Sequence, residues 1–154
     1  MTGEKFLELI RTVVEKCVVL KDKYVQENDI VIDYVCLFSH SPEEYQEFLT
    51  HASHLGTVAS ETETGPVFAF NTPPSTSAGK PKVLKIRKPD LARPQMGYVD
   101  FTTDYQSFKK KYLGRQGFSL IQRKEFEMME LRDKAFNVLV YFSSIPQSAL
   151  LGAT

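Results

Sequence analysis

The sequence predicts an α+β fold in which two βαβββ modules form one cupped mixed sheet, preceded by an extra N-terminal amphipathic helix. The first observation is an internal repeat. The stretch Gly97–Phe108 holds an apolar run with a tyrosine near its start, followed by Asp-Tyr-Gln-Ser-Phe. An earlier copy runs through Asp33–Phe38 and resumes at Glu44–Phe48 as Glu-Tyr-Gln-Glu-Phe. The second observation is that three short strand-like segments follow each copy. A repeat of this kind indicates duplication of a supersecondary unit.

Residues 1–28 are expected to form one helix, over about 4–27, that packs on the rest of the domain. Apolar side chains recur at steps of three and four residues, and charged residues fill much of the remainder, which is typical of an amphipathic helix. The apolar positions are Phe6, Ile10, Val13, Cys17, Leu20 and Tyr24. A helix with such a stripe usually packs on a core, and a partner-binding helix is the alternative.

Residues 29–90 are assigned to the first module. Its first strand, 30–38, is rich in Val, Ile, Tyr and Phe. Alternation is expected to place four side chains on one face, namely Ile32, Tyr34, Cys36 and Phe38, and three on the other, namely Asp33, Val35 and Leu37.

A helix should follow from Ser41 to about Leu55, because Ser41 can cap it, Pro42 suits its first position and Glu44 completes a capping box. Three further strands are expected at 57–63, 66–71 and 82–87. On the last of these, Val83, Lys85 and Arg87 should share one face, opposite Leu84 and Ile86.

Residues 95–143 are assigned to the second module and 144–154 to a C-terminal tail. A strand is expected at 98–102, a helix capped by Thr103 after it, and three strands at 118–123, 126–131 and 137–142. The order of elements therefore repeats that of the first module.

Composition excludes several function classes. The 154 residues hold 19 basic and 19 acidic side chains, so no net charge would attract nucleic acid. Apolar runs such as 138–142 are too short to span a bilayer. Glycine-rich phosphate loops, dinucleotide fingerprints and nucleophile elbows do not occur in the sequence. Cys17 and Cys36 are expected to be free thiols in a reducing, cytoplasmic setting.

The order of these elements resembles the vicinal oxygen chelate superfamily, which includes glyoxalase I, bleomycin-resistance proteins and extradiol dioxygenases. Ile32-Asp33-Tyr34-Val35 is similar to the Ile-Asp-His-Val start of that family, and Leu131–Val140 resembles its Arg-Asp-Pro-Asp-Gly-Asn hairpin. The layout, including the hairpin at Gly65–Phe68, also resembles the bacterial YecM-type proteins. The resemblance spans about residues 30–142 and implies a cup in each curved half-sheet.

The resemblance also implies where a metal would be bound, and the usual ligands are replaced at those positions. The first-strand histidine corresponds to Tyr34 and that of the second module to Tyr98. The fourth-strand glutamate corresponds to Lys85 or Arg87 in the first module and to Val140 in the second. Tyrosines and cations are poor ligands for divalent ions. We therefore expect neither a metal nor another cofactor.

The first functional hypothesis is a metal-free protein that binds a small anionic, partly apolar molecule, a carboxylate or a phosphate, in the cup. Arginine offers a planar fork to such groups, and tyrosines offer hydroxyls and aromatic walls. The expected ligand-binding residues are Tyr34, Lys85, Arg87, Tyr98 and Asp100. A purely structural alternative is that the tyrosines fill the cup and Arg87 pairs with Asp100.

Two other hypotheses remain open. One is a metal-dependent lyase, isomerase or dioxygenase-like enzyme that uses Asp100 and Glu130. The other is an interaction module that acts through the N-terminal helix. Nucleic-acid and membrane partners are not expected, and a homodimer is expected by analogy with the superfamily alone.

Overall fold

The computed structural model describes residues 1–150, and residues 151–154 lie outside that description. The elements in chain order are α1 (Gly3–Tyr24), β1 (Val31–Phe38), α2 (Pro42–Leu55), β2 (Gly56–Thr62), β3 (Gly65–Phe70), β4 (Val83–Arg87), β5 (Gly97–Thr102), α3 (Tyr105–Tyr112), β6 (Phe118–Gln122), β7 (Glu127–Leu131), β8 (Val138–Ser143) and α4 (Gln147–Leu150). This is the predicted order of a helix followed by two βαβββ units.

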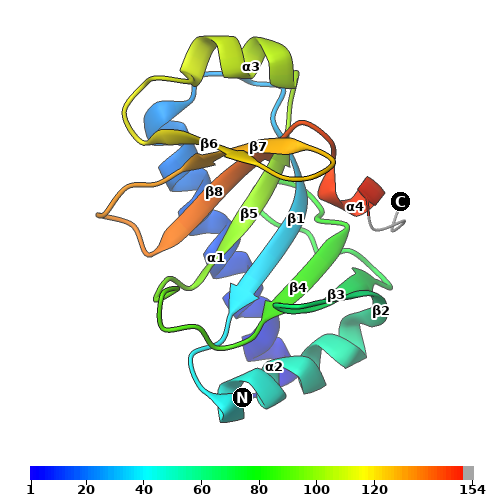
Figure 1. The fold of residues 1–154 in the computed structure, drawn as a ribbon. Coiled ribbons are helices and arrows are strands. Elements are labelled where there is room, and N and C mark those ends of the chain that lie inside the picture. Colours follow the sequence, from blue (N-terminus) through cyan, green and yellow to red (C-terminus); the bar gives the residue numbers. More distant parts are fainter. Residues whose placement is uncertain (151–154) are drawn as a thin grey trace.

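All eight strands form one mixed sheet in the order β2-β3-β4-β1-β5-β8-β7-β6. Each unit contributes four adjacent strands, and the second unit repeats the first in mirrored order. Within each unit the first strand pairs parallel with the last, β1 with β4 and β5 with β8. The two units meet where β1 and β5 pair antiparallel at the centre of the sheet. The predicted α+β fold is confirmed (Figure 1).

Helix α1 crosses behind the central strands and covers one face of the sheet (Figure 1). Its apolar stripe is buried in the main core, where Phe6, Ile10, Val13, Val14, Cys17 and Leu20 have no exposed surface. Thr2 caps the helix by accepting a hydrogen bond from the Lys5 amide at 3.1 Å. The stripe that could have bound a partner is therefore already occupied by the sheet.

The opposite face of the sheet carries a second, smaller apolar cluster that includes Tyr34, Cys36 and Phe38 of β1. These three residues share a face as predicted. The prediction was wrong for Ile32, which lies in the main core with Val35. The pairing of β1 with β5 shifts register between Ile32 and Tyr34, and such a bulge reverses the alternation of side chains at that point.

The start of α2 follows the sequence prediction. At its end, the capping glycine is not in the left-handed conformation that glycine often adopts after a helix. Ser41 accepts a hydrogen bond from the Glu44 amide at 3.1 Å, and Pro42 occupies the first helical position. Gly56, which ends the helix, is extended, with φ of −169°. A Cβ at Gly56 would lie 2.1 Å from the carbonyl oxygen of Ala69. Glycine is required there because β3 approaches closely.

Within the segment assigned to the C-terminal tail, Gln147–Leu150 form the short helix α4, which the sequence analysis did not predict. The Asp33 carboxylate holds this helix. It accepts hydrogen bonds from the Ser148 amide at 3.0 Å and from the Ser148 hydroxyl at 2.5 Å. The residue before Ser148, Gln147, is thereby placed at the cup.

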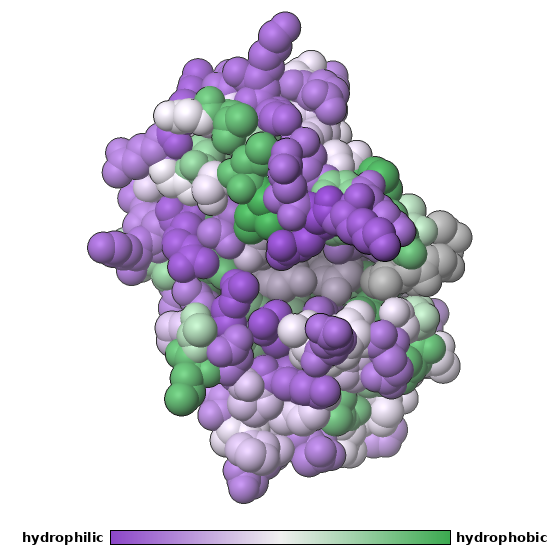
Figure 2. All heavy atoms as spheres, in the orientation of Figure 1, coloured by the Kyte–Doolittle hydropathy of each residue, from purple (hydrophilic) through white to green (hydrophobic). Residues whose placement is uncertain are grey.

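The cup opens on the side of the sheet away from α1. In the space-filling view of this side (Figure 2), hydrophilic residues predominate and hydrophobic residues form smaller patches among them.

Within residues 1–150, no helix combines the length and the apolarity that crossing a membrane requires.

Candidate functional site

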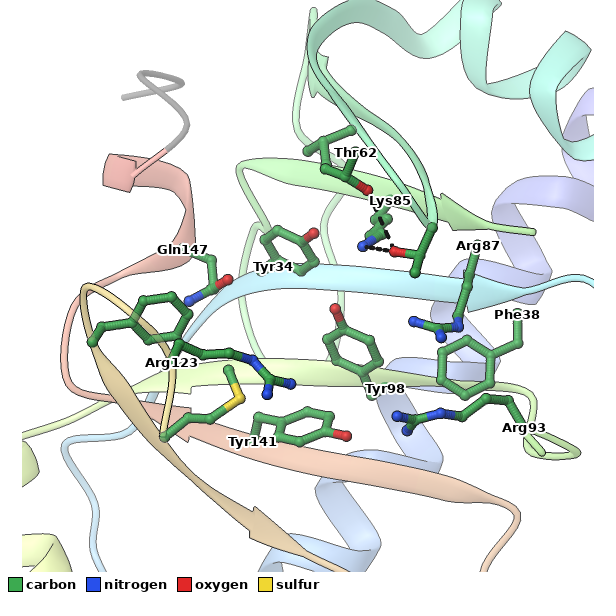
Figure 3. Close-up of a pocket in the computed structure, with 14 residues that line it drawn as sticks. Tyr34, Phe38, Thr62, Lys85, Arg87, Arg93, Tyr98, Arg123, Tyr141 and Gln147 are labelled. Atoms are coloured by element: carbon green, nitrogen blue, oxygen red, sulfur yellow. Dashed lines mark hydrogen bonds between the residues drawn. The ribbon is translucent and has the colours of Figure 1, made fainter. Parts of the chain in front are cut away.

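The cup contains a cavity of about 370 Å³ (Figure 3). Its lining is strongly cationic. Four basic side chains contribute to it, and within the described chain no aspartate or glutamate does. The four are Lys85, Arg87, Arg93 and Arg123. Lys85 and Arg87 alternate on β4, whereas Arg93 precedes β5 and Arg123 lies in the turn between β6 and β7. The two modules therefore both supply positive charge.

The amine of Lys85 is held by a neutral partner. Its Nζ donates a hydrogen bond to the Thr64 hydroxyl, with 2.6 Å between nitrogen and oxygen. Burial lowers the pKa of this amine, and the nearby charges of Arg87 and Arg123 lower it further. The nearby Cys36 side chain raises the pKa of the Lys85 amine and so opposes these effects. Burial and like charges both disfavour the ammonium form of Lys85 relative to an exposed lysine.

Arg87 makes one ion pair, and its contacts leave hydrogen-bonding capacity unused. One terminal nitrogen lies 3.3 Å from Asp90 Oδ2, and the guanidinium carbon lies 5.8 Å from the centroid of the Phe38 ring. The Arg87 Nε and the Gln147 Nε2 are buried without a hydrogen-bond partner among residues 1–150. A buried donor without an acceptor costs about 1–3 kcal/mol. A ligand rich in oxygen atoms would supply hydrogen-bond acceptors for these two cavity-lining side chains.

Three tyrosines form the aromatic part of the lining. The Tyr34 and Tyr98 rings stack with 6.0 Å between centroids, and Tyr141 meets Tyr98 edge-on at 4.8 Å. Burial raises the pKa of all three hydroxyls, that of Tyr141 to about 12 with help from the Glu130 carboxylate. The hydroxyls are therefore protonated at neutral pH, and that of Tyr141 donates its hydrogen bond to Glu130. These rings fill part of the cup, as the structural alternative expected, but they leave the cavity open.

Asp100 does not belong to the cavity lining, and its proposed role as a ligand-binding residue is not supported by its position. It is only 1% exposed. One oxygen accepts a hydrogen bond from the Ser143 hydroxyl at 2.6 Å, and the other has no partner among residues 1–150. Burial raises the pKa of the Asp100 carboxyl to about 8. The pair between Arg87 and Asp100 that the structural alternative considered does not form, since Arg87 pairs with Asp90.

Glu130, the second carboxylate considered for an enzyme, is engaged elsewhere. It accepts a hydrogen bond from the Tyr141 hydroxyl at 2.8 Å and one from Arg132 Nε at 3.2 Å. Like Asp100, it is absent from the lining of the cavity. Asp100 and Glu130 therefore serve separate buried contacts.

The residues at the positions where the resembled superfamily binds a metal do not fit one. Tyr34, Lys85, Arg87 and Tyr98 all line the cavity, and their hydroxyls and cations are the wrong donors for a divalent ion. Val140 was wrongly aligned with a ligand, because it lies in the main core. Its neighbours Leu139 and Tyr141 face the cup. Among residues 1–150 there is no group of three His, Cys, Asp or Glu side chains arranged to hold an ion.

Comparison with known proteins supports the fold. A solved structure described as "Structural Genomics, Protein EC4020" superposes with a TM-score of 0.75 at 10% sequence identity, covering 97% of this chain and 91% of that one. Methylmalonyl-CoA epimerase from Mycobacterium tuberculosis gives a TM-score of 0.48 at 15% identity, covering 84% of this chain and 99% of that one. No protein-family model matches the sequence, and no curated protein does.

The first similarity extends over nearly the whole chain and concerns the fold alone. The second is too slight to carry an argument about activity. The vicinal oxygen chelate and YecM-type layouts therefore remain resemblances of the sequence, and function has to be argued from the cavity itself.

The structure brings together four of the five residues that the sequence predicted for the site, namely Tyr34, Lys85, Arg87 and Tyr98. Sequence reasoning missed several others, namely Thr64, Arg93, Arg123, Tyr141 and Gln147. Tyr141 could have been found, because alternation along the last strand places it two residues from Leu139 on the cup face. The others lie outside regular strands, where no periodicity indicates which way a side chain points.

Proposed function

We propose that this protein binds a small, anionic, partly apolar molecule in the cup without using a metal. The observation that carries the proposal is the cluster of Lys85, Arg87, Arg93 and Arg123 around one cavity that no carboxylate of the described chain lines. Like charges in a partly buried space repel one another, and a bound anion would relieve that repulsion.

The aromatic residues indicate the rest of the ligand. Tyr34, Tyr98 and Tyr141 present ring faces and edges, with Phe38 and Phe126 beside them in the lining. Such walls suit a planar or apolar body, while the arginine forks suit the oxygens of a carboxylate or phosphate. The cavity volume of about 370 Å³ lies near the lower end of the range for small-molecule sites. We infer a compact ligand with few atoms beyond one ring.

The test is calorimetric titration of the purified protein with benzoate, phthalate, phenyl phosphate and citrate. At least one of these should bind, with an affinity that falls as salt is added, because the attraction is electrostatic. Arg87→Ala should weaken that binding by at least about tenfold, the order of magnitude expected for one lost charge-assisted hydrogen bond.

The matched control is Arg115→Ala, which removes an exposed arginine that lies over the Tyr112 ring outside the cup. It should leave the affinity unchanged. Equal affinities of the wild type and Arg87→Ala, or no binding by any of the four anions, would overturn the proposal. Divalent zinc or manganese added to the same titrations should not increase the affinity, and a stoichiometric metal requirement would contradict the metal-free part of the proposal.

A further inference from the structure

We propose that Lys85 is a nucleophile that forms a Schiff base with an anionic carbonyl compound, an oxo acid or an aldehyde bearing an acidic group. The inference rests on the proposed anion site and names its substrate class. It adds a covalent step that an anion-binding site alone does not need.

The position of Lys85 distinguishes it from the other lysines. It is the single lysine among the cavity-lining residues of the described chain. Its amine contacts the Thr64 hydroxyl, and no carboxylate within residues 1–150 forms an ion pair with it. Lys23 and Lys111, by contrast, lie 2.7 and 2.6 Å from the carboxylates of Asp133 and Glu27, and these contacts raise the pKa of both amines.

The surroundings of Lys85 favour the neutral amine that nucleophilic attack requires. Arg87 lies two residues along the same strand, and Arg123 approaches from the turn between β6 and β7. β1 contributes Cys36, which is paired with Lys85 in the sheet, and Tyr34, while β5 contributes Tyr98. The thiol and both hydroxyls carry raised pKa values and are neutral at physiological pH. Within residues 1–150, the charged groups that lower the pKa of the Lys85 amine are the guanidinium groups of Arg87 and Arg123.

The chemistry balances without an oxidant or another reactant. The Lys85 nitrogen attacks the carbonyl carbon, and the electron pair of the C=O π bond moves to oxygen, which takes up a proton. That proton comes from the nitrogen, and the product is a neutral carbinolamine. The carbinolamine then loses its hydroxyl group as water, which takes the second proton of the nitrogen, as the C=N bond forms. We assign the transfer of the first proton to the Tyr34 hydroxyl, which lines the same cavity as Lys85. Tyr34 lies on β1, the strand that pairs with β4, and the side chains of Tyr34 and Lys85 both point into the cavity (Figure 3).

The cations have a positioning role in this step. Arg87 and Arg93 lie together at one side of the cavity, beside the Phe38 ring, while Arg123 and Gln147 lie at the other (Figure 3). An acidic group bound by an arginine pair would leave the carbonyl carbon free to approach the amine between them. The anion site thus restricts the reaction to carbonyl compounds that also carry a negative charge.

The experiment treats the full-length protein with 4-formylbenzoate and sodium cyanoborohydride, which fixes the imine as a stable secondary amine. Peptide mass mapping then locates the adduct. At limiting reagent we expect higher occupancy at Lys85 than at exposed Lys88, because the cationic cavity binds the carboxylate of the reagent beside the Lys85 amine. Excess 4-(hydroxymethyl)benzoate, which lacks the carbonyl, should protect Lys85 by competition. Glyoxylate serves as a second, smaller probe.

Two variants complete the test. Lys85→Arg removes the amine and should lose the adduct, and Lys88→Arg should label like the wild type. Adducts spread over surface lysines with both probes, or labelling of Lys85 that the competitor does not reduce, would overturn the inference. If 4-(hydroxymethyl)benzoate nevertheless binds, the anion site stands without the covalent step. If neither it nor the four test anions bind, both proposals fail.

Discussion

The rings of Tyr34 and Tyr98 stack almost parallel, with 6.0 Å between centroids and 8° between planes. They come from β1 and β5, the strands at which the two modules meet. The floor of the cavity is therefore built by the junction of the duplicated units, and each unit supplies the same residue type at the corresponding position. The stability of the sheet centre and the shape of the site depend on the same two side chains.

Replacing Tyr34 should separate the packing role of its ring from the role of its hydroxyl. Tyr34 is 3% exposed, so Tyr34→Ala should lower the free energy of unfolding by about 3–5 kcal/mol, as is usual for a buried aromatic residue. Tyr34→Phe keeps the ring and should cost less than about 1.5 kcal/mol. Denaturant unfolding followed by circular dichroism measures both. A similar cost for the two variants would contradict a predominantly packing role of the ring.

Asp100 should make the protein less stable as the pH rises. Burial raises the pKa of its carboxyl to about 8 in the folded protein, the nearby Asp33 adds to the rise, and the hydrogen bond from Ser143 opposes it. In the unfolded chain the value is about 4. The folded state therefore holds the proton more tightly, and its advantage is complete below about pH 4 and is lost between about pH 4 and pH 8.

Asp100→Asn should remove this dependence, so that the stability difference between wild type and variant changes across that pH range. Asp133→Asn is a control of opposite sign. Lys23, followed by Tyr24, lowers the pKa of the Asp133 carboxyl, so its contribution is present above about pH 4 and is lost on acidification. Urea unfolding at pH 2, 3, 5, 6, 7 and 8 compares the variants, and the two lowest pH values cover the titration of Asp133. Parallel curves for wild type and Asp100→Asn would rule out the raised pKa.

Asp33 should affect anion binding indirectly, because it holds α4 and α4 carries the cavity-lining Gln147. Asp33→Ala removes the acceptor for the Ser148 amide and hydroxyl, which are buried, at a cost of about 1–3 kcal/mol. We expect faster amide hydrogen exchange over residues 145–150. Affinity for the test anions should fall by less than in Arg87→Ala, because only Gln147 is displaced.

The control for this prediction is Asp29→Ala, which removes an exposed carboxylate lying 3.4 Å from the Thr103 hydroxyl. Exchange over residues 145–150 should be unchanged in that variant. Unaltered exchange in Asp33→Ala would mean that α4 is held by other contacts.

Local sequence signals were sufficient to predict strands β1 to β8, helices α1 to α3 and part of the site. The alternation of Lys85 and Arg87 with Leu84 and Ile86 on β4 is visible in the sequence, and the repeat aligned Tyr34 with Tyr98. These residues lie in regular strands, where the period of two fixes the face of each side chain. The capping residues of α2 carried a similarly local signal.

The remaining features depend on tertiary structure. The bulge that turns Ile32 toward the main core arises from the pairing of β1 with β5, which the sequence of β1 alone does not encode. Arg93 and Arg123 reach the cavity from irregular segments, and Gln147 reaches it because Asp33 binds a residue 115 positions away. Asp100 was assigned to the correct face of the sheet. Its burial and its hydrogen bond from the Ser143 hydroxyl could not be inferred from alternation.

Gly97 should be indispensable at the junction for a reason unrelated to glycine flexibility. It pairs with Leu37 across β1 and β5, and a Cβ there would lie 2.0 Å from the carbonyl oxygen of Cys36. Backbone atoms cannot rotate away as a side chain can, so the two central strands would have to separate. Gly97→Ala should therefore lower the free energy of unfolding by about 1–3 kcal/mol or more.

Separation of the strands would also disturb the stacking of Tyr34 on Tyr98, so the affinity for the test anions should fall together with the stability. Gly3→Ala is the matched control, because a Cβ at Gly3 meets no atom within 4 Å and alanine favours the helix. Its stability should equal or slightly exceed that of the wild type. A Gly97→Ala protein with wild-type stability and wild-type affinity would show that β1 and β5 can move apart without cost, which their place at the centre of the sheet argues against.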